Sequence, residues 1–211
     1  MNLAADYGGG AMFLVAGVLG ALLNARATGI GQVVDVGMTD CASYLGSLFY
    51  GMKAAGERVD RREANLIDGE AHFYGTYRCA DDRWVAIGSI EPQFYRLLVD
   101  TMNLGDALLG PQMDKMAWPA RKAALAAAFA TKTRDEWCAL MEGTDVCFAP
   151  VLSMEEAPRH PHNVARGTFA EIGGVTLPAP VPRFSATPGA AQWPPEPAAL
   201  DPEPVLSRWL G

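Results

Sequence analysis

The sequence of 211 residues predicts an α/β protein that continues into a smaller α+β part. Three patterns predict this fold class. Two apolar helical stretches near the N-terminus flank a short β-rich run, a hairpin pattern with helices follows, and a proline-rich run ends the chain. Helix, strand and helix in succession are typical of an α/β layer, whereas a hairpin followed by helices is typical of an α+β unit.

The first apolar stretch is AMFLVAGVLGALL, residues 11–23. We expect a loop over the first seven residues and a helix over about 10–26, opened by the three glycines at 8–10 and ended by TGIG at 28–31. These thirteen apolar residues span roughly 20 Å, too short for a bilayer. Asp6, and the lack of a basic residue before the stretch, exclude a signal peptide. The pattern therefore predicts a helix buried on all sides and no membrane span.

QVVDVG at 32–37 predicts a short strand, and a second apolar helix is expected over about 38–55, with Gly56 at its end. One strand cannot form a sheet, so its neighbours must lie elsewhere. Residues 56–69 are polar and irregular, typical of a crossing between domains. The basic residues Arg58, Arg61 and Arg62 in this segment are interpreted as a solvated loop.

FYGTYRC (73–79) and RWVAIGSI (83–90) predict a hairpin joined by residues 80–82. Helices are expected at about 92–103, 119–131 and 134–142, with a buried strand over 145–153. Thr133 with Glu136 and Ser153 with Glu156 have the spacing of capping boxes. A second hairpin around residues 173–174, an extended proline-rich run over 178–204 and a short helix over 203–210 complete the chain.

Composition excludes several classes of function. A net charge of −7 argues against a nucleic-acid surface, which needs a basic face. The four cysteines have no C-x-x-C spacing and are interpreted as reduced, mostly buried thiols of a cytoplasmic protein. His160 and His162 fall in a proline-rich loop and His72 stands alone, so we expect no metal site.

Two carboxylates are candidate catalytic groups because each stands just before a helical pattern. Asp6 precedes the glycine run by two residues, and Glu91 directly precedes Pro92 and a helix. Unpaired N–H groups and the helix dipole favour an ionised carboxylate there, which can serve as a general base. Acidic residues at helix starts are more often caps, so the pattern alone favours a structural role. The glycines lack the spacing of a dinucleotide fingerprint and indicate close backbone approach instead.

Five sequence segments, which follow one another in the same order as in a known family, favour a catalytic role for these carboxylates. NLAADYGGGAMFLVAGVLGAL, TGIGQVVDVGM, AHFYGTYRCADDRWVAIGSIEPQFY, TRDEW and GTDVCFAPVLSMEEA resemble the class III CoA-transferase (CaiB/BaiF-like) superfamily. Within it, IEPQFY at 90–95 is similar to the alpha-methylacyl-CoA racemase branch. The resemblance covers nearly the whole chain, which corresponds to the C-terminal portion of the family's proteins. The family usually has D-G-G-A-P-F-Y where this chain has DGEAHFY, and His72 is disfavoured as a replacement base because its neighbours indicate a strand.

The resemblance implies an isomerase that moves a proton at C2 of a 2-methylacyl-CoA thioester through an enolate. Asp6 is the implied first base, and Glu91 is the implied partner of a histidine that lies upstream of these residues. Further implied substrate-binding residues are Asn2, Gly8, Gly9, Gly10 and Tyr74. CoA is part of the substrate, and the resemblance implies no metal or organic cofactor.

The implied fold is a Rossmann-like large domain with a small α+β domain, in an interlocked dimer. Residues 1–64 are then the remnant of the large domain, 65–165 the small domain, and 166–211 a return segment with a proline-rich tail. The implied partner is a second copy or an N-terminal segment of the same family. Two other functions stay open: a CoA-transferase with Asp6 as acyl-accepting nucleophile, and an inactive fragment that only binds a partner.

Overall fold

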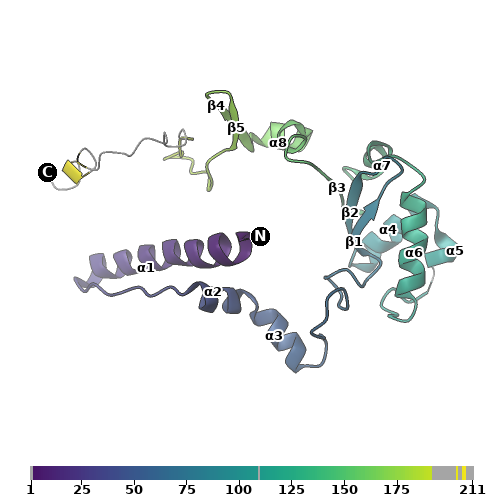
Figure 1. Cartoon of the computed structure of the whole chain (residues 1–211), viewed down its shortest axis with the longest axis horizontal. Helices are drawn as coiled ribbons and strands as arrows, with labels where there is room; N and C mark the ends of the chain where they lie inside the picture. The colour runs from purple at the N-terminus through teal and green to yellow at the C-terminus, as the bar shows by residue number, and fades with distance from the viewer. Residues whose placement is uncertain (1, 109, 192–202, 204–205, 208–211) are drawn as a thin grey trace. The chain divides into compact units, whose positions relative to one another are not determined.

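Figure 1 shows the computed structural model, which describes residues 2–108, 110–191, 203, 206 and 207. The chain divides into two compact units, Met1–Ala149 and Pro150–Gly211. These units are defined by contacts within this chain and do not test the predicted domains. The domain boundaries expected after residues 64 and 165 therefore stay a prediction. Most of the helix expected over 203–210 lies outside the described residues.

The first unit begins with a helix that starts earlier than the sequence predicted. A π-helical segment, η1 (Leu3–Ala11), runs directly into α1 (Met12–Thr28). The expected loop over the first seven residues is therefore wrong, and the glycines at 8–10 lie inside the helix. The predicted end is confirmed, because Gly29 closes α1 with a left-handed φ of 76°.

Burial of this helix on all sides is also wrong for the described chain. No residue of α1 is buried, and its leucines stand out, with Leu19 57% and Leu23 67% exposed. The run Leu3–Thr28 has 26 residues and is apolar enough to cross a membrane by length and composition. The argument that the stretch is too short fails, because the helix continues beyond the apolar residues. Core helices of soluble proteins pass the same test, so the finding is weak evidence for a membrane span.

The predicted strand at 32–37 does not form. These residues pair with no strand in the part of the chain that the structure describes, because no neighbouring strand is there to accept their backbone hydrogen bonds. The next helix is divided in two, α2 (Met38–Leu45) and α3 (Ser47–Ala54). Gly46 lies between them with φ −79° and ψ 0°, which interrupts the helical path expected over 38–55.

The hairpin is confirmed as β1 (Tyr74–Arg78) and β2 (Trp84–Gly88), antiparallel with Tyr74 opposite Gly88. The third strand, β3 (Phe148–Val151), joins them in the order β1-β2-β3. Its side chains alternate between half-buried and exposed, so the prediction of a buried strand is wrong.

Four helices accompany this sheet in Figure 1: α4 (Pro92–Met102), α5 (Gly105–Leu108), α6 (Trp118–Phe129) and α7 (Arg134–Met141). The three longer ones confirm the prediction, and α5 was missed. Aromatic rings fill the core: Tyr77 stacks on Phe129 at 5.1 Å between centroids, and Phe129 meets Trp137 edge-on at 5.2 Å. These contacts hold the hairpin against α6 and α7.

The second unit contains η2 (Ala157–Arg159), α8 (Pro161–Arg166) and a hairpin of β4 (Phe169–Ile172) and β5 (Val175–Pro178). The hairpin is confirmed, with Ile172 opposite Val175. The prediction that both histidines lie in a loop is wrong for His162, which lies within α8, while His160 occupies the N-cap position of that helix. Residues 179–191 contain no helix or strand.

Candidate active site

Asp6 lies in the first turn of η1, half-buried, and its backbone N–H donates to the Asn2 carbonyl at 3.0 Å. Asn2 is the residue before the helix and is exposed. The sequence predicted that Asp6 lies near the start of a helix, which is confirmed. The helix, however, starts at Leu3 and not after the glycines. The Asp6 side chain is not a cap, because the capping position belongs to Asn2. Asp6 thus meets the positive end of the helix dipole.

The glycine run lets η1 approach α2 closely. Gly9 is buried, and a Cβ there would lie 3.1 Å from the Ala4 carbonyl oxygen and 3.6 Å from the Ala42 nitrogen. Gly10 faces Met38, whose Cβ would be 3.8 Å away, and Gly8 is exposed. Gly9 therefore permits close approach of the α2 backbone, while close approach of a ligand to the glycine run stays a prediction.

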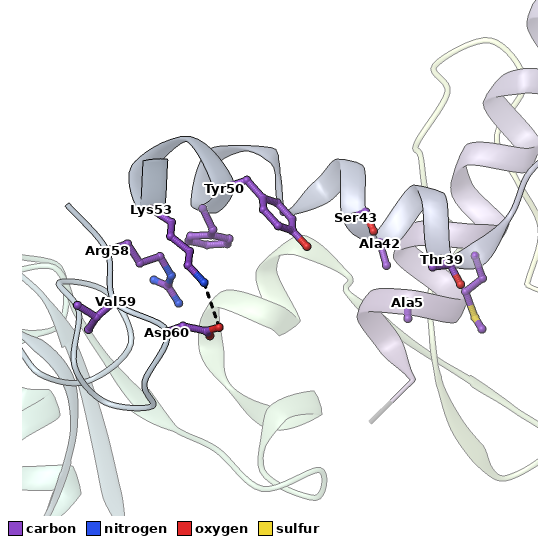
Figure 2. Close-up of a pocket in the computed structure, with 12 residues that line it drawn as sticks. Ala5, Thr39, Ala42, Ser43, Tyr50, Lys53, Arg58, Val59 and Asp60 are labelled. Carbon is purple, nitrogen blue, oxygen red and sulfur yellow. Dashed lines mark hydrogen bonds and ion pairs between the residues drawn. The ribbon is translucent and has the colours of Figure 1, made fainter. Parts of the chain in front are cut away.

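A groove of about 640 Å³ begins at Ala5, next to Asp6, and follows α2 and α3. Figure 2 shows Ala5 and Thr39 toward one end and Lys53 with Asp60 at the other. Lys53 pairs with Asp60 at 3.2 Å, and Arg58 lies over the Phe49 ring at 4.6 Å. The groove offers apolar and aromatic walls with two cations at one end.

The sequence interpretation of the basic cluster as a solvated loop needs a partial correction. The Arg62 side chain is 93% exposed, as expected, but that of Arg58 is only 24% exposed and pairs with Asp68 at 3.6 Å. Arg58 was missed as a groove residue because its contacts, with Phe49 and Asp68, depend on the fold of the segment.

Glu91 occupies the N-cap position of α4, as the sequence predicted, with φ −71° and ψ 140°. Its backbone carbonyl accepts the first helical bond, from the Tyr95 N–H at 3.0 Å. Its exposed side chain makes no capping hydrogen bond among the described residues, and its catalytic role stays a prediction. The carboxylate is therefore not engaged in closing its own helix.

Tyr74 and Cys147 line a shallow cavity of about 370 Å³ around the end of β2. A Cβ on Gly88 would lie 3.4 Å from the Tyr74 ring, so a glycine fits this contact best. The Gly88 N–H donates to the Cys147 carbonyl at 2.9 Å. Burial, and then the Glu91 carboxylate, raise the pKa of the Cys147 thiol. The backbone bond to Gly88 therefore places Cys147 against the end of β2, three residues before Glu91.

Sequence reasoning missed Cys147, which was grouped with buried thiols. All four cysteines are free, with Cys41 and Cys79 buried, Cys138 half-buried and Cys147 exposed. Nothing in its local sequence signals that it lies against the end of β2, because the two segments are far apart along the chain. Among the described residues, no three His, Cys, Asp or Glu side chains are grouped so as to hold a metal ion.

The predicted site residues thus fall into two groups. Asp6 and the glycines lie in η1, with Asn2 just before it, whereas Tyr74 begins β1 and Glu91 precedes α4. No hydrogen bond or ion pair between described residues joins the two groups. His72, disfavoured as a base, is fully buried, with its Nε2 2.8 Å from the Tyr95 hydroxyl oxygen.

The chain belongs to CoA-transferase family III, whose model matches residues 2–200. The family expected from the sequence is confirmed.

Among its relatives, the chain is 41% identical to the alpha-methylacyl-CoA racemase of Mus musculus over 189 residues, and 41% identical to that of Homo sapiens over 190. Each match covers 89% of this chain and 50% of the relative, so the chain spans about half the length of these racemases. The fold resembles the crystal structure of Rv3272 from Mycobacterium tuberculosis, with a TM-score of 0.64 and 20% identity over 85% of this chain and 48% of that one.

Proposed function

We propose that this chain acts in the interconversion of (R)- and (S)-2-methylacyl-CoA thioesters by 1,1-proton transfer. The observation that carries the proposal is the 41% identity to alpha-methylacyl-CoA racemases over 89% of the chain. The placement of Asp6 at a helix start and the uncapped Glu91 carboxylate support it. CoA is part of the substrate, and no metal or organic cofactor is required by this chemistry.

In this mechanism Asp6 removes the proton at C2, and the electron pair moves toward the thioester carbonyl to form an enolate. The dipole at the start of η1 favours the ionised carboxylate that the first step needs. A second base returns a proton to the opposite face of C2. The family resemblance assigns that base to a histidine upstream of these 211 residues, held in place by Glu91. Asn2, Gly8, Gly9, Gly10 and Tyr74 line the substrate.

The proposal includes an assembly. An N-terminal segment of the same family brings the histidine and completes a Rossmann-like large domain, and a second copy of the chain is the proposed partner in an interlocked dimer. The cytoplasm is the proposed location. Exposed leucines along α1 support this part, because apolar surface of that kind is normally covered by further protein.

A second candidate function is that of a CoA-transferase, the activity after which CoA-transferase family III is named. Asp6 would then attack the thioester carbonyl carbon and release CoA thiolate, which leaves a mixed anhydride on the carboxylate. In later steps the original acyl group would leave as its free acid, and an acceptor acid would take the CoA as a new thioester. This reaction leaves the C–H bond at C2 intact, so the fate of that proton separates the two functions.

The deciding experiment incubates a chiral 2-methylacyl-CoA in heavy water, with the chain alone and with a separately expressed N-terminal racemase segment. We expect deuterium at C2 and loss of optical purity. Transfer of CoA to an added carboxylic acid without deuterium uptake would establish the transferase instead. If neither reaction occurs with both pieces present, the third alternative, a fragment that only binds a partner, is the one that survives.

The roles of the carboxylates are tested with Asp6→Asn and Glu91→Gln, which keep shape and remove charge. We expect Asp6→Asn to lower the exchange rate by roughly a hundredfold or more, as for loss of a general base. Asp35→Asn is the matched control, because Asp35 lies in the segment between α1 and α2 and outside the predicted site. Equal rates for Asp6→Asn and the control would remove Asp6 from the mechanism.

A further inference from the structure

Only three residues connect β2 to α4, and the last of them is Glu91. Ser89 is completely buried; its N–H donates to the Phe73 carbonyl at 3.0 Å and its hydroxyl to the Val146 carbonyl at 2.6 Å. The Ile90 N–H donates back to the Gly88 carbonyl at 2.9 Å. The connection is thus held from two sides, one being the end of β1 and the other the segment before β3.

A third side is held by one side chain, that of Gln112. Its amide nitrogen donates to both the Ser89 and the Ile90 carbonyls, each at 2.9 Å. A carboxamide NH₂ has two protons, so one group satisfies two neighbouring acceptors at once. These two peptide groups come immediately before Glu91, which ties the direction of its backbone to the position of Gln112.

Gln112 is itself fixed by α6. The indole N–H of Trp118, a ring that is 1% exposed, donates to the Gln112 carbonyl at 2.8 Å. The Arg121 guanidinium donates to the adjacent Pro111 carbonyl at 2.8 Å. The support therefore runs from the buried face of α6 through Gln112 to the connection that bears Glu91.

We propose that Gln112 is a positioning residue for Glu91, whose place in the connection it fixes through the Ser89 and Ile90 carbonyls. The importance of this positioning for catalysis rests on the proposed function. The position of Glu91 itself can be tested without any measurement of activity. Gln112 touches no reacting atom and acts only through the two carbonyls that precede Glu91.

Cys147 reports where the Glu91 carboxylate lies. Burial, the Glu91 carboxylate and the Asp145 carboxylate each raise the pKa of this exposed thiol. If Glu91 swings away, its contribution is lost while burial and Asp145 remain. The thiol then ionises at lower pH, and the pH dependence of its alkylation moves with it.

The experiment measures Cys147 alkylation by iodoacetamide from about pH 7 to about pH 11, a range that brackets thiol ionisation, with the modified peptide quantified by mass spectrometry. Glu91→Gln defines the full effect of losing the charge, and we expect its midpoint to fall by roughly half a pH unit. Gln112→Met keeps the volume and removes both donors, so its midpoint should fall in the same direction. Lys122→Met is the control, because Lys122 on α6 also donates to a backbone carbonyl, that of Gly69.

A Gln112→Met protein with the wild-type midpoint would overturn the proposal, and so would a Glu91→Gln protein with no shift. Near-UV circular dichroism shows whether each variant is folded. If Gln112→Met is not, Gln112→Asn replaces it, because its amide is one methylene too short to reach both carbonyls. We expect that variant to shift as well, and a wild-type midpoint there overturns the proposal.

Heavy-water exchange separates this inference from the proposed function. We expect Gln112→Met to slow exchange at C2 by roughly tenfold while Lys122→Met leaves it unchanged. If Gln112→Met moves the thiol midpoint but Glu91→Gln exchanges at the wild-type rate, Gln112 still positions Glu91 and the catalytic role of Glu91 fails.

Discussion

At the scale of single residues, His72 is a histidine of the buried core, and its burial determines its protonation state. It is completely buried, and its ring meets Phe73 and Tyr95 edge-on. The Tyr95 hydroxyl donates to the Leu108 carbonyl at 3.2 Å, so it accepts from His72 and Nε2 carries the proton. Nδ1 is buried and has no hydrogen-bond partner among the residues that the structure describes. The imidazole therefore belongs in the neutral form, as a core residue.

This burial makes stability depend on pH. Burial, with the nearby Arg121 charge, lowers the pKa of His72 from 6.5 to about 4. The unfolded chain thus binds the proton first as pH falls, and stability is lost from pH 6.5 down to about pH 4. The shift corresponds to a loss on the order of 3 kcal/mol. Urea unfolding of wild type and His72→Gln across this range measures it. Equal slopes with pH for the two proteins would contradict this assignment.

For single residues, the sequence predicted correctly those features that depend only on neighbouring residues in the chain. Pro92 after Glu91 predicted the helix start, and the glycine run predicted close backbone approach. Cys147 and Gln112 could not be found, because their contacts with the connection before α4 are made across β3 and the loop after α5. The side chain of Asp6 was placed near a helix start for the wrong reason, since the glycines do not open the helix.

At the scale of elements, α7 has its own start signal. The Glu136 N–H donates to the Thr133 hydroxyl at 3.3 Å, and the Thr133 N–H donates to the Glu136 carboxylate at 2.7 Å. Both bonds of the predicted capping box are therefore present. The hydrogen bond from the Thr133 backbone also lowers the pKa of Glu136.

Removing this cap should destabilise the protein measurably. We expect Thr133→Ala to lower the free energy of unfolding by about 1 kcal/mol, since the first turn of α7 loses an acceptor. Glu136→Gln is the control, because glutamine accepts the same bond and should cost less. Guanidinium titration of the two variants checks this, and equal losses would show that charge, not the box, stabilises the start of α7.

The elements between residues 73 and 142 were predicted well because turns, first-turn prolines and caps are short-range signals. The elements before residue 56 were predicted less well. Apolar composition in α1 and in residues 32–37 indicated burial and pairing, but both depend on neighbouring strands that the described chain does not supply. An apolar sequence pattern predicts that a surface is buried, but it does not predict which segment buries it.

At the scale of the whole molecule, the uncovered face of α1 should dominate behaviour in solution. Leu14, Leu19, Leu22 and Leu23 are between 45% and 67% exposed on one helix. Exposed apolar surface of this extent favours association. We expect sedimentation velocity to show oligomers or aggregates, and a double change of Leu19 and Leu23 to lysine to shift the distribution toward monomer. A monodisperse wild-type monomer would contradict the expectation.

The support around Glu91 has a consequence for engineering. The hydrogen bonds described above that hold the connection before α4 all come from within residues 73–147, and none comes from η1 or α1. The two acids can therefore be retuned one at a time. Grafting this stretch from a relative should transplant the surroundings of Glu91 intact while leaving those of Asp6 native, so chimeras can test the proposed role of each carboxylate separately.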